Sequence, residues 1–161
     1  MSSSDRRSFL ALILLAGCGF TPAYGPGGGA RGLQASIRAD DPTDKNSFDL
    51  VQRLEDRLGR SDAPRFALAY TITTKAVGVG VTPENVTTRF NLTGQVDWTL
   101  TEIATQTRVT GGRVDSFTSW SATGSTVAGL AAEEDAALRL MRILADQIVM
   151  RLTATADGWL Q

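Results

Sequence analysis

The stretch RFNLTGQVDWTLT, residues 89–101, is the clearest alternation of apolar and polar side chains in the chain. Apolar residues at every second position predict a β-strand with one face against a core and the other in water. The apolar positions are Phe90, Leu92, Val96, Trp98 and Leu100, and the polar face carries Arg89, Asn91, Thr93, Gln95, Asp97, Thr99 and Thr101. A sheet built around this strand needs other elements to cover its apolar face.

Similar patterns flank this strand in the sequence. Alternation over residues 66–72 leads to a turn near residues 83–85, and a strand of about residues 108–120 follows a turn near residues 105–106. Three such strands joined by short turns predict an antiparallel meander. A change of parity within the third strand predicts a β-bulge at Gly111-Gly112.

Two segments have helical periodicity. Leucines at positions 50, 54 and 58 recur every four residues and predict a helix that Asn46 or Ser47 caps and that Gly59 ends. A longer helix is predicted over about residues 127–154, where apolar residues from Leu130 onward keep near-helical spacing.

A short first strand is predicted within residues 33–38, so the order is strand, helix, three-strand meander and long helix. This order predicts an α+β fold: a two-layer sandwich with a four-stranded, mostly antiparallel sheet and two amphipathic helices packed on one face. The expected organisation is a lipoprotein-type signal peptide (1–17), a lipidated flexible tether (18–32), a single α+β domain (33–156) and a C-terminal tail (157–161).

The N-terminus has the layout of a secretory signal peptide. Arg6 and Arg7 precede an apolar run, residues 9–16, that is too short to span a bilayer. The run ends in Leu15-Ala16-Gly17-Cys18, which resembles a bacterial lipobox and makes Cys18 the expected site of lipid attachment. A conventional signal peptide with an incidental cysteine is the alternative, and the export route, Sec or twin-arginine, stays open.

Composition excludes several classes of function. The chain has 0 histidines and 1 cysteine, which removes the usual general base and zinc sites of the His or Cys type. A formal net charge of −1 gives no global field that would attract nucleic acid. We therefore expect no catalytic residues, no metal and no cofactor apart from the lipid on Cys18. A hydrolase of the Ser-Lys or two-carboxylate type stays open in principle, although no compact motif for one is present.

The chain resembles the lipopolysaccharide-assembly lipoprotein family LptE in its alphaproteobacterial form. The resemblance rests on CGFTPAYG (18–25), on Arg57-Leu58-Gly59 and on a late run from Glu134-Asp135-Ala136 through Arg139 and 144–148 to Arg151-Leu152. It implies a non-enzymatic lipoprotein on the periplasmic side of the outer membrane. Such a protein plugs and helps to assemble the LptD β-barrel and assists delivery of lipopolysaccharide to the outer leaflet. An auxiliary lipoprotein of a lipid-shuttling ABC transport system is the alternative.

A plug that touches lipopolysaccharide needs cations near the phosphates of that lipid. Lys75 and Arg89 flank the first meander hairpin, and Arg65 and Arg113 lie on meander strands. We select these four as candidate contacts to lipopolysaccharide or to the barrel. Ordinary solvated surface charge is the alternative for each of them.

Overall fold

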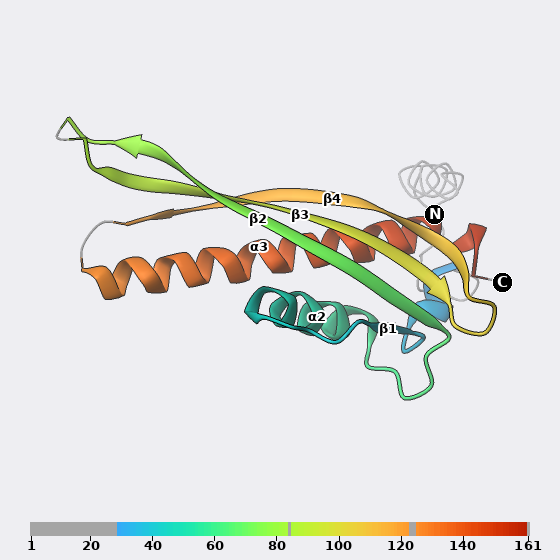
Figure 1. Cartoon of the computed structure of the whole chain (residues 1–161). Helices are drawn as coiled ribbons and strands as arrows, with labels where there is room; N and C mark the ends of the chain where they lie inside the picture. The colour runs from blue at the N-terminus through green and yellow to red at the C-terminus, as the bar shows by residue number, and fades with distance from the viewer. Residues whose placement is uncertain (1–28, 84, 123–124, 161) are drawn as a thin grey trace, which may run out of the picture.

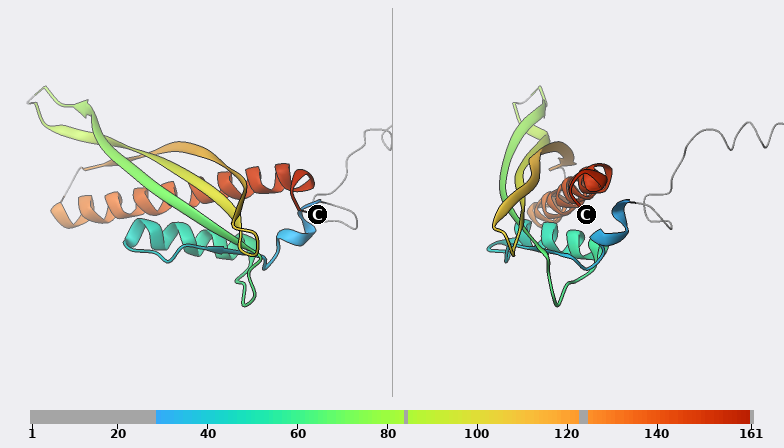
Figure 2. Two further views of the ribbon diagram at one scale, coloured as in Figure 1. Left: turned by 45° about the vertical axis from the view of Figure 1, so that its right-hand side comes forward. Right: turned by 90° about the vertical axis from the view of Figure 1, so that its right-hand side faces the viewer.

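The computed structural model describes residues 29–160, apart from residues 84, 123 and 124. A sheet forms one layer, and two helices form the second layer on a single face of that sheet (Figures 1 and 2). The predicted α+β sandwich is therefore confirmed. Cys18, the predicted signal peptide and residues 18–28 of the predicted tether lie outside the described part of the chain.

The elements follow one another in the predicted order, with a short 3-10 helix at each end. They are η1 (Gly29–Leu33), β1 (Ile37–Ala39), α2 (Lys45–Leu58), β2 (Phe66–Val81), β3 (Thr87–Glu102), β4 (Thr107–Ser121), α3 (Thr126–Thr155) and η2 (Ala156–Gly158). The strands lie in the spatial order β1-β2-β3-β4. β1 is parallel to β2, whereas the other two pairs are antiparallel, so the sheet is mixed and mostly antiparallel.

The predicted cap of α2 was wrong by a few residues. Asp44 is the N-cap: its Oδ1 accepts from Ser47 N at 2.7 Å, and Ser47 Oγ accepts from Asp44 N at 2.9 Å. Ser47 is thus the reciprocal partner in a capping box rather than the cap itself. At the other end Gly59 ends the helix as predicted, with φ 79° and its N–H donating to Glu55 O at 2.8 Å.

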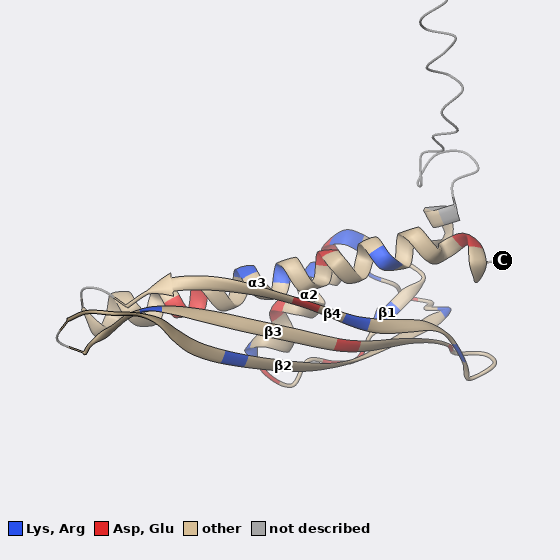
Figure 3. Ribbon diagram, turned by 90° about the horizontal axis from the view of Figure 1, so that it is seen from above, with Lys and Arg blue, Asp and Glu red and all other residues tan. Residues whose placement is uncertain are grey.

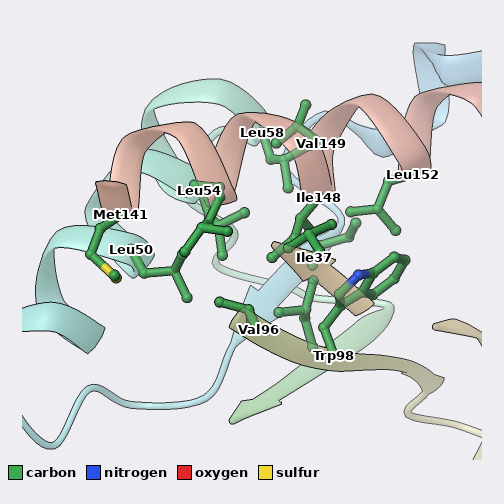
Figure 4. Close-up of a cluster of buried hydrophobic side chains, with 14 of the residues drawn as sticks. Ile37, Leu50, Leu54, Leu58, Val96, Trp98, Met141, Ile148, Val149 and Leu152 are labelled. Atoms are coloured by element: carbon green, nitrogen blue, oxygen red, sulfur yellow. The ribbon is translucent and has the colours of Figure 1, made fainter. Parts of the chain in front are cut away.

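The core lies between the sheet and the helices (Figure 4). Side chains of α2 and α3 meet there with Ile37 of β1 and with Val96 and Trp98 of β3. α3 can approach β3 closely because Gly94 has no side chain: a Cβ there would lie 2.8 Å from Leu140 Cδ2. The glycine that interrupts the apolar alternation of the central strand is therefore the place where a helix packs.

The predicted β-bulge exists, but it lies closer to the start of β4. Leu100 pairs with Thr110 and the next residue, Thr101, pairs with Arg108, which leaves Val109 as the extra residue. Gly111 and Gly112 are in regular register with β3. The prediction of a bulge in this strand was correct, but its predicted position at Gly111-Gly112 was wrong. The two glycines allow close packing instead.

Both ends of the domain differ from the predicted boundaries. Ala30 and Leu33 of η1 are buried in the core, so residues 29–32, predicted to belong to the tether, are part of the folded domain. β1 is shorter than predicted and starts only at Ile37. The predicted C-terminal tail packs as well, because the ring of Trp159 meets Phe66 edge-on with centroids 5.3 Å apart.

The end of the molecule away from η1 and η2 is thinly covered. The β2–β3 hairpin and the start of α3 both extend there, beyond α2 (Figure 1). Along α3 the core begins only at Ala136, and Leu130, predicted to belong to the apolar stripe, is 58% exposed. The helical periodicity was correct, but the sheet opposite the first turns of α3 does not cover them.

Candidate interaction surface

The face of the sheet that points away from the helices is polar and uncovered, as the alternation predicted. Figure 3 looks onto this face and shows scattered charged positions among neutral ones. Phe117 of β4, which is 61% exposed, and Val77 of β2, which is opposite Asn91 and 41% exposed, are apolar exceptions on this face. We call this surface the outer face; it consists of the outward residues of β2, β3 and β4.

Arg113 is held in a network at the middle of the outer face. Its Nε donates to Asp97 Oδ1 at 2.7 Å and its Nη2 to Asp97 Oδ2 at 3.3 Å, while Gln95 Nε2 donates to the same Oδ2 at 2.9 Å. The hydrogen bonds from Arg113, and then the one from Gln95, lower the pKa of Asp97. The partnership in turn raises the pKa of Arg113. Arg113 is thus already neutralised by a carboxylate.

Arg65 lies just before β2, at the end of the sheet near η1 and η2. Its Nε donates to Glu102 Oε1 at 3.1 Å, and its guanidinium carbon lies 5.0 Å from the centroid of the Phe66 ring. Hydrogen bonds from Thr105 and then from Arg65 lower the pKa of Glu102. This arginine, like Arg113, has a structural partner.

Lys75 and Arg89 are in a different situation. Both are exposed, and neither forms an ion pair within the described residues. Lys75 is opposite Thr93, which in turn is opposite Phe117, while Arg89 lies between Gly80 and Ser121 in the register. Thr93 and Arg89 are four positions apart, a spacing of about 13 Å along the strand. The four predicted cations are therefore spread along the sheet and do not form one cluster.

Arg108 was not among the predicted cations. An open depression of about 810 Å³ on the outer face is lined by Arg108 together with Arg113, Thr71 and Thr99. A Cβ on Gly111 would come within 2.9 Å of Arg108 Nη2 and 2.7 Å of the Trp98 carbonyl oxygen, so glycine is what gives the arginine its place against the sheet. The signal in the sequence was a glycine pair shortly after an arginine in a strand.

Two absences hold for the part of the chain that the structure describes. No group of acidic or cysteine side chains there is placed to hold a metal ion. Nor does any helix within residues 29–160 combine the length and the apolar character that crossing a membrane requires.

Comparison with known families decides the affiliation. The model of the lipopolysaccharide-assembly family LptE matches residues 34–152, which is most of the chain and nearly all of the folded part. The chain belongs to the LptE family. Membership implies a role in lipopolysaccharide assembly, and it places the protein among non-enzymatic lipoproteins.

Solved structures show the same fold in other members of the lipoprotein class. A candidate lipoprotein from Caulobacter crescentus superposes with a TM-score of 0.70 at 24% identity, covering 83% of this LptE-family chain and 99% of that chain. Rare lipoprotein B from Shewanella oneidensis gives a TM-score of 0.60 at 12% identity, with 80% and 99% covered. Lipoprotein B from Nitrosomonas europaea gives 0.56 at 13% identity, with 78% and 84% covered. No curated protein matches this sequence.

Proposed function

We propose that this LptE-family protein is an outer-membrane lipoprotein, anchored on the periplasmic side through lipid on Cys18, that occupies the lumen of the LptD β-barrel. In this position it helps to assemble the barrel and assists delivery of lipopolysaccharide to the outer leaflet. The observation that carries the proposal is the family match over residues 34–152, taken with an outer face that is polar and uncovered.

The physical argument concerns the solvent on each side of the sheet. The interior of a large outer-membrane barrel is polar and hydrated, whereas its lipid-facing exterior is apolar. A protein inserted in that lumen keeps its own core and presents polar strands to the barrel. The outer face of this sheet meets that requirement with threonine, asparagine, glutamine and paired charges, and it needs no rearrangement to do so.

Among the four candidate cations, the geometry favours Lys75 and Arg89 as contacts to lipopolysaccharide or to the barrel. A phosphate that binds Arg113 or Arg65 must compete with Asp97 or Glu102 for the guanidinium. Lys75 and Arg89 have no such competitor within the described residues, and they lie toward the thinly covered end of the molecule.

Affinity purification from detergent-solubilised outer membranes of the native host tests the proposal. We expect a large β-barrel in near-stoichiometric amount, identified by mass spectrometry, and labelled palmitate on the wild-type protein. Cys18→Ser is the matched variant and should lose the label. Recovery of inner-membrane transporter subunits without a barrel would contradict the proposal, and retention of palmitate by Cys18→Ser would remove Cys18 as the anchor.

The cation assignment has its own experiment. Lys75→Ala combined with Arg89→Ala should reduce the lipopolysaccharide or the barrel that copurifies with the protein. Arg113→Ala is the control for the single variants Lys75→Ala and Arg89→Ala, since each of the three removes one cation from the same face. Equal losses for the three single variants would show that general charge, rather than these two positions, governs the contact.

A further inference from the structure

One edge of the sheet is left open along most of its length. β1 pairs only with residues 66–68 of β2, although β2 continues to Val81. The last backbone hydrogen bond on this side runs from Asp40 N to Leu68 O at 3.0 Å. Beyond it, Ile72 is half-buried, and Thr74 and Ala76 are exposed. We call the backbone of these last three residues the free edge of β2.

The direction of the backbone groups follows from the register. Phe66 N donates to Ser36 O, and Leu68 O accepts from Asp40 N, so the even-numbered residues of β2 direct their N–H and C=O groups toward β1. Pairing with β3 is regular from residue 66 to residue 78, and this direction therefore persists through the free edge. No hydrogen bond in the described part of the chain reaches the edge-facing groups of these residues.

The opposite edge of the sheet is protected. Side chains of α3 cover the backbone of β4: Arg139 Nη2 donates to Ser119 O and Gln147 Nε2 to Asp115 O, each at 3.3 Å. β4 also carries the bulge at Val109. Proteins commonly protect edge strands with bulges, prolines, charges or covering elements. Residues 72–76 of β2 include no bulge and no proline, and Lys75 is the charged residue among them.

We propose that an extended segment of the barrel partner adds to the sheet as a fifth strand along the free edge of β2; this inference rests on the proposed function. A row of unpaired N–H and C=O groups is recognised by another extended backbone, as in β-strand addition. An added strand would lie on the side of β2 where β1 already pairs, directly beyond the end of β1. Lys75 projects beside it on the outer face, where a carboxylate of the added segment would form an ion pair.

A second copy of this chain is a poorer occupant. Antiparallel pairing of two free edges about Thr74 would make the two Lys75 side chains diagonal neighbours on the same face, within about 7–8 Å. Like charges at that spacing repel each other. A segment of a different chain avoids this repulsion, and a carboxylate on it would pair with Lys75.

Hydrogen exchange in the purified complex of full-length protein and barrel provides the first test. The amides of Ile72, Thr74 and Ala76 should exchange rapidly in the protein alone and at least about tenfold more slowly in the complex, because hydrogen bonding requires opening before exchange. Unchanged exchange at these amides, with protection elsewhere on the protein, would overturn the inference and leave the proposed function standing. Failure of any barrel to copurify would remove both.

A proline variant gives an independent readout. Thr74→Pro removes an N–H that points away from β3, and so it spares the pairing within the domain while blocking an added strand. We expect binding to the barrel about tenfold weaker than for Thr74→Ala, which removes the side chain and keeps the N–H. Circular dichroism establishes that both variants are folded. Equal binding by two folded variants would contradict strand addition, and a dimer formed by the wild-type protein alone would point to the second copy.

Discussion

Gly94 is where α3 packs directly on β3, and replacing it with alanine should destabilise the domain. A Cβ at this position would lie 2.8 Å from Leu140 Cδ2 and 3.1 Å from Leu144 Cδ1, and both leucines are fully buried. Forcing an extra methyl into such a core costs about 1–3 kcal/mol. Restriction of the unfolded chain by alanine offsets about 0.4–1 kcal/mol of this. With the middle of each range, the net loss in free energy of unfolding is about 1.3 kcal/mol.

Urea denaturation of the purified protein measures this loss, and a second substitution identifies its cause. Leu140→Ala alone should cost about 2–5 kcal/mol by leaving a cavity. If the clash is with Leu140, the double variant loses less than the sum of the two single variants by at least about 0.5 kcal/mol. Gly129→Ala is the control, since nothing lies within 4 Å of a Cβ there, and it should be neutral or stabilising. Additive losses, or a stable Gly94→Ala protein, would refute the packing argument.

Three further predictions concern hydrogen bonds that position the helices. Asp44→Ala should cost about 1 kcal/mol of unfolding free energy. Hydrogen bonds from Ser47 lower the pKa of Asp44 below its ordinary 3.8. The stabilisation that the Asp44 carboxylate provides is therefore fully present above pH 3.8 and is lost as the pH falls through the folded-state pKa. In acid denaturation curves the variant should converge on wild type. Asp146→Asn breaks the two-hydrogen-bond contact from Arg53 and, at a half-exposed site, should cost at most about 1 kcal/mol in urea titrations. Thr118→Val removes a buried 2.8 Å hydrogen bond to Ala136 O and should lower the urea midpoint by the equivalent of about 1 kcal/mol, whereas no change would show that the bond contributes nothing.

The periodic parts of the sequence predicted the fold well. Residues 89–101 alternate because one face of β3 is buried and the other is wet, and each side chain therefore reports its own environment. The leucines of α2 and the apolar positions in the later part of α3 likewise predicted which side chains are buried. Gly94 was passed over as a gap in the alternation, since only the packed structure reveals that Leu140 occupies the missing side chain's place.

Local features that several neighbouring residues could provide, such as a helix cap or a bulge, were harder to predict. Several polar residues stand near the start of α2, and which of them caps it depends on where the chain turns, so Asp44 was missed in favour of Asn46 or Ser47. The bulge was placed at the glycines because a parity change does not identify the extra residue. The burial of Ala30 was also not predictable, since a glycine-rich segment carries no periodic signal.

The candidate surface was also predictable only in part. Alternation identified the polar outer face, but it could not show that Asp97 and Glu102 already bind Arg113 and Arg65. Ion pairs between neighbouring strands depend on register, and register follows from turn lengths that a sequence leaves uncertain. The free edge of β2 exists because β1 ends after pairing with residues 66–68, and the sequence did not reveal where that pairing ends.

Surface lipopolysaccharide after controlled depletion of this protein in its native host is the measurement that tests the account most directly. The account predicts that lipopolysaccharide accessible at the cell surface falls as the protein is lost, together with the amount of correctly assembled barrel. Re-expression of the wild-type protein should restore both. Normal surface lipopolysaccharide and a normal barrel in cells that lack the protein would contradict the central claim.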